Sequence, residues 1–166
     1  MKHLSPYRMA TYLLVVFCAG HTAGGMLAQK SLGPDSDAVF ASMKAVHFNF
    51  NGADCTWYGF WFAFGLTASV FLVFSAIVAW QLDKVGPEQW PAIATIAWAF
   101  VASHVGYAIL SWKYFFAGPG VLASLVAVLL GIGAWRKHAR AVGPRGAQLG
   151  ERVSSRIGHV IRSDRE

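Results

Sequence analysis

Two histidines lie inside long apolar stretches of the chain, where ionisable side chains are uncommon. His21 is the 13th residue of a stretch that begins at residue 9, and His104 is the 13th residue of a stretch that begins at residue 92. At a rise of about 1.5 Å per residue, helices that run in the same direction would place both imidazoles at a similar depth. We therefore predict that His21 and His104 line one cavity.

Imidazoles on facing helices suit two kinds of chemistry. As neutral axial ligands, His21 and His104 would hold a b-type haem for electron transfer. As polar groups in a cavity, they would contact a lipophilic ligand such as a lipid or a quinone. A structural alternative is a hydrogen bond from each ring to a carbonyl group of a neighbouring helix. The sequence favours the ligand pocket over haem and leaves the structural alternative open.

Further polar and aromatic side chains gather where the second apolar stretch begins. A carboxylate beside histidines supports acid–base chemistry or proton relay, although a simple helix-capping role for Asp54 is the favoured interpretation. These residues would form the mouth of a polar funnel that leads down to the two intramembrane histidines. No metal site other than haem is expected. The candidate ligand-binding residues are therefore His21, His104, His47, Asp54, Trp57 and Tyr58.

Four stretches without a charged residue must position these side chains. They cover residues 9–29, 55–82, 89–112 and 114–135, and a helix needs about 20 residues to cross a hydrocarbon core. Only 13% of the 166 residues are charged and 55% are hydrophobic, which excludes an ordinary soluble domain or a disordered chain. We predict an all-α fold, an integral membrane four-helix bundle over residues 1–135. Its spans are expected at about 9–29, 57–81, 91–112 and 116–135.

The connection between the first two spans is long enough to hold an element of its own. Residues 31–34 are expected to form a loop, followed by a helix that Ser36 or Asp37 caps. Apolar residues then recur at helical spacing. They are Val39, Met43, Val46 and Phe50. We predict a short amphipathic helix that lies across the outer mouth of the bundle.

The distribution of Lys and Arg predicts the orientation. Lys30, Lys44 and Lys113 fall on one side of the four spans, whereas the other basic residues fall on the opposite side. Because basic residues are enriched in cytoplasmic segments, both termini are expected in the cytoplasm. The first apolar stretch also resembles a signal peptide. It is longer than a typical signal core, so we expect it to stay uncleaved; cleavage would leave three spans.

Residues 136–166 form a predicted basic cytoplasmic tail. They hold eight of the 14 Lys and Arg residues and include a glycine-rich segment, residues 143–150, that is expected to be a linker. Such a tail suits contact with anionic lipid. No nucleic-acid partner is expected, because the net charge of +6 is explained by membrane topology and lipid contact.

Three segments carry a resemblance to known proteins. They are MKAVHFNF at residues 43–50, TWYGFWFAFG at residues 56–65 and SWKYFF at residues 111–116. With them the chain resembles an uncharacterised family of small bacterial four-helix integral membrane proteins, and its general plan is similar to that of DoxX-like proteins. The resemblance covers most of residues 10–135. It implies the fold but transfers no catalytic residue.

Together these features predict a small multi-pass protein of the bacterial inner membrane. It is expected to bind a lipophilic ligand or to act as an accessory membrane subunit. The alternatives are a b-type haem electron-transfer protein and a purely structural subunit of a membrane complex. The expected partners are membrane lipids, a lipophilic small molecule, and another membrane protein or a second copy of the chain. No motif assigns a reaction, so the sequence leaves open whether the protein is an enzyme.

Overall fold

Four long helices dominate the computed structural model, which describes residues 4–28 and 30–163, with side chains up to residue 143. Each is long and apolar enough to cross a membrane. These candidate spans are Pro6–Leu27, Trp57–Lys84, Trp90–Tyr114 and Ala117–Gly143. The structure therefore confirms the all-α fold class and the four predicted spans, and the protein is a membrane protein.

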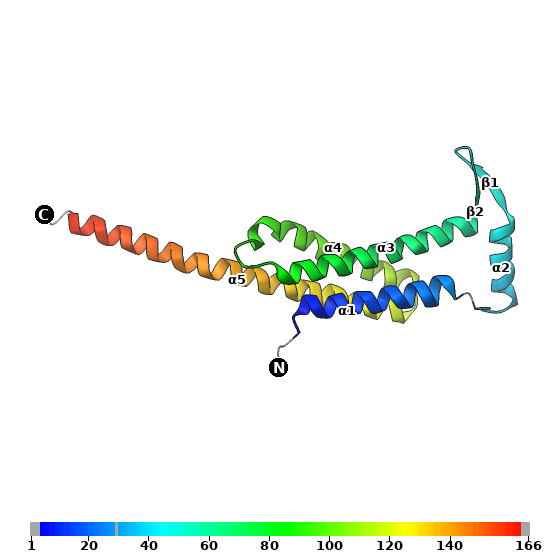
Figure 1. Ribbon diagram of the computed structural model, residues 1–166, viewed down its shortest axis with the longest axis horizontal. Coiled ribbons are helices and arrows are strands. Elements are labelled where there is room, and N and C mark those ends of the chain that lie inside the picture. The colour runs from blue at the N-terminus through cyan, green and yellow to red at the C-terminus, as the bar shows by residue number, and fades with distance from the viewer. Residues whose placement is uncertain (1–3, 29, 164–166) are drawn as a thin grey trace. The chain divides into compact units, whose positions relative to one another are not determined.

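The order of the elements can be followed in Figure 1. The first span consists of an α-helix that passes directly into a π-helix, and a short helix and a β-hairpin precede the second span. The elements are α1 (Pro6–Ala19), η1 (Gly20–Leu27), α2 (Pro34–Ala45), β1 (His47–Phe50), β2 (Ala53–Thr56), α3 (Trp57–Lys84), α4 (Trp90–Tyr114) and α5 (Ala117–Ser163).

The chain divides into two compact units, each of which is described by itself. The mouth unit is Ala10–Ala79, and the tail unit consists of the chain up to Met9 together with the part from Trp80 onwards. Within the mouth unit, η1 packs closely on α3. Gly65 makes this approach possible, because a Cβ atom there would clash with Cε of Met26. Small residues at such contacts let membrane helices approach one another.

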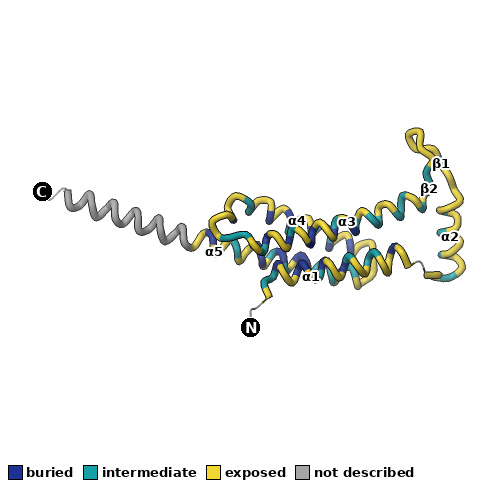
Figure 2. Tube along the Cα trace, viewed as in Figure 1, coloured by how far each residue is buried: buried dark blue, intermediate teal, exposed yellow. Residues whose placement is uncertain are grey.

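In the tail unit, α4 and α5 are antiparallel neighbours joined by only two residues, Phe115 and Phe116. Trp112 donates a hydrogen bond from Nε1 to Oγ of Ser124, at 3.0 Å. Farther along the pair, a Cβ atom on Gly131 would contact a methyl group of Val101 at 3.8 Å. Figure 2 shows buried residues along α4 and α5, whereas α2 and the hairpin are exposed or half-buried.

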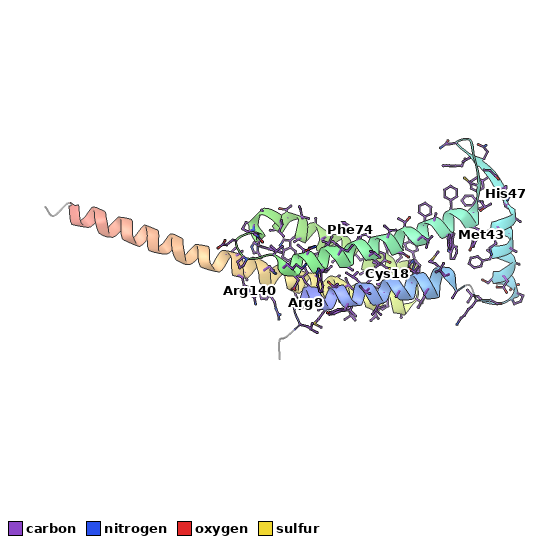
Figure 3. The ribbon with its side chains drawn as sticks, in the orientation of Figure 1. Arg8, Cys18, Met43, His47, Phe74 and Arg140 are labelled. Atoms are coloured by element: carbon purple, nitrogen blue, oxygen red, sulfur yellow. The ribbon has the colours of Figure 1, made fainter. Side chains whose placement is uncertain are left out.

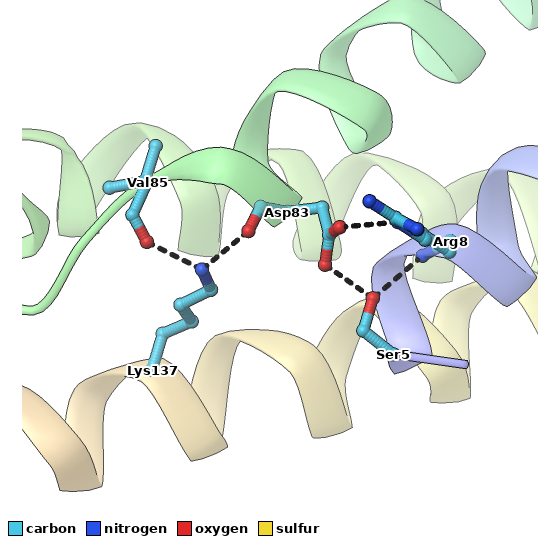
Figure 4. Close-up of polar contacts among 5 residues, drawn as sticks. All are labelled: Ser5, Arg8, Asp83, Val85 and Lys137. Carbon is cyan, nitrogen blue, oxygen red and sulfur yellow. Dashed lines mark hydrogen bonds and ion pairs between the residues drawn. The ribbon is translucent and has the colours of Figure 1, made fainter. Parts of the chain in front are cut away.

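A polar cluster ties the start of the chain to the end of α3 (Figure 4). The carboxylate of Asp83 accepts hydrogen bonds from Oγ of Ser5 and from Nε of Arg8, the latter at 2.8 Å. From α5, Nζ of Lys137 donates to the carbonyl oxygens of Asp83 and Val85, at 2.7 and 2.5 Å. Lys137 thus satisfies carbonyl groups at the end of α3 that have no partner within the helix.

The segment between the first two spans differs from the prediction in two respects. A short helix is present, but it begins at Pro34, because proline suits the first position of a helix. Ser36 and Asp37 therefore lie within the helix and do not cap it. Val46 and Phe50 lie beyond the helix, which ends at Ala45.

The β-hairpin was not predicted. Its turn is Asn51-Gly52, where both residues adopt positive φ, 52° and 89°. Asn-Gly is the preferred pair for such tight hairpin turns, so this dipeptide was the available signal.

The linker expected at residues 143–150 is also a wrong prediction, because α5 continues as one helix to Ser163. A proline in a helix interior removes one hydrogen bond, but it can kink a helix without ending it.

Candidate functional site

The described residues form a pocket in the mouth unit, next to the end of the first span. Its volume is about 590 Å³, which falls in the usual range for small-molecule sites. The walls come from the end of η1, the loop that follows it, α2 and the first turns of α3. The residues used below are Gly24, Gly25, Lys30, Phe40, Lys44 and Trp61. We call this space the mouth pocket.

One side of the mouth pocket is aromatic. Phe40 of α2 and Trp61 of α3 meet edge to face, with ring centroids 5.3 Å apart and ring planes at 76°. This is a favourable geometry for an aromatic pair. Trp61 also packs on Tyr58, one turn earlier, at 5.6 Å between centroids. The pair Phe40–Trp61 therefore gives the pocket an ordered apolar wall.

The charged lining residues are two lysines and one aspartate. Asp37 is already engaged by the loop, since its carboxylate accepts hydrogen bonds from Oγ of Ser31 and, at 3.4 Å, from the amide of Leu32. The ammonium group of Lys44 lies 4.6 Å from the centroid of the Tyr58 ring. Such a cation–π contact positions an ammonium group without neutralising it. The lining therefore combines two lysines with one aspartate, and Lys44 is held against the Tyr58 ring.

The η1 wall of the pocket is open because it is built from glycine. A Cβ atom on Gly24 would meet nothing within 4 Å, and one on Gly25 would meet only Nδ1 of His21, at 3.8 Å. These glycines belong to a π-helix, a rare and wide helix that is often found at functional sites. The π-helix was not predicted; the glycines at positions 20, 24 and 25 were its only sequence signal.

His21 makes the hydrogen bond that the structural alternative describes. Its Nε2 lies 2.9 Å from the carbonyl oxygen of Gly65, and a carbonyl only accepts, so Nε2 carries the proton. In the neutral ring Nδ1 is then the acceptor, on the side of Gly25. The neighbouring Thr22 donates to Oγ of Ser69 at 2.7 Å. His21 therefore helps to join η1 to α3.

Cys18, one turn before Thr22, makes a further hydrogen bond between the first span and α3; its side chain is labelled in Figure 3. Its thiol donates to the carbonyl oxygen of Ser69, with sulfur and oxygen 3.6 Å apart. Cys18, His21 and Thr22 thus share one helical face. Hydrogen bonds of this kind hold neighbouring membrane helices together.

His104 lies in α4 and is buried, with only 1% of its surface exposed. Its Nδ1 donates to the carbonyl oxygen of Phe100, one turn earlier, at 3.0 Å. The imidazole also packs edge to face on the ring of Phe100. His104 belongs to the tail unit and His21 to the mouth unit. A shared cavity, and haem ligation by this pair, therefore stay predictions.

The other predicted site residues lie on or next to the hairpin. His47 and Asp54 form a hydrogen bond across it, with Nδ1 and Oδ2 2.9 Å apart and both side chains exposed. Asp54 does not cap α3. Thr56 does, because its Oγ1 accepts a hydrogen bond from the amide of Gly59 at 3.0 Å.

None of the six predicted site residues lines the mouth pocket. Trp57 packs on Phe48 of the hairpin, with ring centroids 4.8 Å apart. Tyr58 comes closer, since it contacts both Lys44 and Trp61, which do line the pocket. His21 is separated from the pocket by Gly25, which has no side chain.

The sequence did not identify Lys30, Lys44, Phe40 and Trp61 as site residues. One signal was available. Lys30 and Lys44 are two of the three basic residues on the side of the spans where such residues are expected to be depleted. Among the described residues, no three His, Cys, Asp or Glu side chains come together to hold a metal ion.

Comparison with family models, with curated proteins and with solved structures found no match. The resemblance to small four-helix membrane proteins therefore stays a prediction, and the mouth pocket is the observation on which a function can be argued.

Proposed function

We propose that the protein binds a lipid-like amphiphile in the mouth pocket. The observation that carries the proposal is the lining of a 590 Å³ space, which combines aromatic rings with two lysines. An apolar wall favours the burial of a hydrocarbon chain or ring system. Charged groups at the rim fix the orientation of a polar headgroup.

The position of the pocket also supports an amphiphilic ligand. The flanking candidate spans end at Leu27 and begin at Trp57, which supports a position of the pocket where membrane and water meet. Gly24 and Trp61 come from within these spans, whereas Lys30 and Lys44 come from the connection between them. A molecule with an apolar tail and a polar head would thus reach the pocket from the membrane surface.

Replacing Gly24 with leucine is expected to weaken amphiphile binding by about tenfold, roughly 1.4 kcal/mol. The new side chain would occupy the pocket, and it would do so without a backbone clash because a Cβ atom there meets nothing within 4 Å. The matched control is Gly20→Leu. Gly20 belongs to the same π-helix and has the same open surroundings, but it does not line the pocket.

Native mass spectrometry of the detergent-purified protein measures this effect. The probes are oleoyl lysophosphatidate and monoolein, which share one acyl chain. Retention of both probes at the wild-type level by Gly24→Leu would refute the proposal, as would an equal loss of binding in Gly20→Leu.

We further propose that the mouth pocket faces away from the cytoplasm of a bacterial cell, with both termini inside. The distribution of Lys and Arg supports this orientation. Site-directed labelling tests it in a background with Cys18→Ser and Cys55→Ser. Asp35→Cys in α2 is expected to react with a membrane-impermeant maleimide on intact spheroplasts, and Glu88→Cys between α3 and α4 only after lysis. The reverse pattern would invert the topology.

A further inference from the structure

We infer that the β-hairpin binds the membrane surface, with its aromatic face in the interfacial layer of the bilayer and its polar face in water. The hairpin is formed by β1 and β2 and turns at Asn51-Gly52. Because the hairpin does not line the mouth pocket, its placement does not depend on what that pocket binds. Its partner is a lipid surface.

The register of the two strands gives the hairpin two different faces. Neighbouring residues in a strand point to opposite sides, whereas residues directly opposite one another on paired strands point to the same side. The apolar face carries the pairs Phe48–Cys55 and Phe50–Ala53. The polar face carries the pairs His47–Thr56 and Asn49–Asp54. The hairpin is therefore amphipathic.

The apolar face of the hairpin continues onto α3. The ring of Phe60 contacts both Phe48 and Phe50, with ring centroids 5.8 Å apart in each case. One turn farther along the helix, Phe60 contacts Phe64 at 6.2 Å. Phe64 is 71% exposed and belongs to a candidate span, where an exposed apolar side chain meets lipid. The aromatic face of the hairpin is therefore an extension of a lipid-facing surface.

The length of α3 brings the hairpin to the level of the lipid headgroups. With 28 residues, α3 is about 42 Å long at a rise of about 1.5 Å per residue. The hydrocarbon core is only about 30 Å thick, whereas the bilayer with its headgroup layers measures about 40–45 Å. The first turn of α3, and the hairpin joined to it, thus fall within a headgroup layer. Trp57 begins α3 and is 58% exposed, and tryptophan is enriched at this level.

The backbone of the hairpin prevents a deeper position. Among the described residues the sheet has two strands, so each strand has one edge without a neighbouring strand. The N–H and C=O groups on such edges are costly to bury in hydrocarbon, but water and headgroups satisfy them at the interface. Figure 1 shows the two strands running across the direction of α3, within the same unit. This direction places the hairpin along the membrane surface.

Nitroxide labels attached to single cysteines test this placement in vesicles of phosphatidylcholine and phosphatidylglycerol. Collisions with oxygen report lipid, and collisions with a polar nickel chelate report water. The background is the full chain with Cys18→Ser and Cys55→Ala. Ala53→Cys and Asp54→Cys are a matched pair, because they are adjacent, exposed residues on opposite faces. We expect the ratio of oxygen to nickel collisions to be about threefold or more higher at position 53, since an apolar phase excludes a polar chelate.

Three further labels calibrate the measurement. Phe50→Cys should follow Ala53→Cys, because Phe50 is directly opposite Ala53 on the apolar face. Phe64→Cys gives the lipid reference, since Phe64 lies within α3 and is exposed. Glu88→Cys gives the water reference, since Glu88 is an exposed charged residue between α3 and α4.

Lipid-like ratios at positions 50 and 53 together with a water-like ratio at position 54 would support the inference. Water-like ratios at all three positions would overturn it, because the hairpin would then stand clear of the membrane. Low collision rates with both reagents at positions 50 and 53 would also overturn it, since protein, such as a second copy of the chain, would then cover the aromatic face. Lipid-like ratios at all three positions would contradict the two-faced placement.

Discussion

Replacing Gly133 with alanine is expected to destabilise the protein by roughly 1–3 kcal/mol, the usual cost of overpacking a core. Gly133 lies in α5 against the ring of Tyr7, from the start of the chain. An added Cβ atom would lie 2.9 Å from both Cδ2 and Cε2 of that ring. Tyr7 is only 1% exposed, so the ring cannot swing aside into solvent. The two helices would have to move apart.

The matched control for Gly133→Ala is Gly131→Ala, two residues away on α5. A Cβ atom on Gly131 would contact Val101 at 3.8 Å, an ordinary van der Waals distance. Alanine there should be neutral or slightly stabilising, since it favours helix over glycine by up to about 1 kcal/mol. Thermal unfolding in detergent, followed by circular dichroism, measures both variants. Equal Tm values for the two variants would contradict the packing that we describe.

Replacing Lys137 with methionine is expected to cost about 2 kcal/mol, because hydrogen bonds from a charged donor contribute roughly that much. The change removes the group that caps the carbonyl oxygens of Asp83 and Val85 at the end of α3 (Figure 4). Methionine keeps the length and the apolar stem of the side chain, so the lost ammonium group accounts for the effect.

Arg136→Met is the control for Lys137→Met, since it removes one positive charge from the adjacent, exposed position. Its Tm should stay close to that of the wild-type protein. A second variant, Lys137→Arg, retains a cationic donor and is expected to recover part of the loss. If Lys137→Met and Arg136→Met lowered Tm equally, the effect would come from net charge and the capping role would be refuted.

The four spans could be predicted because membrane insertion depends on the hydrophobicity summed over consecutive residues. A stretch of about 20 residues without charge is sufficient to indicate a membrane helix. The boundaries at Trp57 and Trp90 also follow from nearby charged residues, Asp54 and Glu88, at which the apolar stretches begin. No knowledge of tertiary contacts is needed for such predictions.

The connection between the first two spans depends on finer signals. Apolar spacing predicted a helix that includes Val46 and Phe50. The helix ends at Ala45 and Phe50 lies in β1, so apolar residues about four apart did not reveal where the helix gives way to a strand. The turn at Asn51-Gly52 decides the matter, since both residues adopt positive φ. In this segment the turn chemistry, not the hydrophobic pattern, was the informative feature.

The candidate site could not be predicted from single residues. His21 and His104 drew attention because an intramembrane imidazole is costly, yet each donates a hydrogen bond to a carbonyl oxygen. Lys30 and Lys44 are ordinary loop and helix residues until tertiary structure places them at one pocket. The pocket forms where η1, α2 and α3 contact one another. The spacing of residues along the sequence does not predict those tertiary contacts.

The discontinuous tail unit has a consequence for the timing of assembly. Tyr7 and Arg8 are synthesised before their partners, since Asp83 and Gly133 lie about 75 and 126 residues farther along the chain. During N-terminal-first synthesis, Arg8 can therefore pair once the end of α3 has been made, whereas Tyr7 meets Gly133 only after much of α5 has been made. The short loop between α4 and α5 favours rapid pairing of those two helices, since their contacts are close in sequence. Formation of α5 around Gly133 is thus the step that completes the packing around Tyr7.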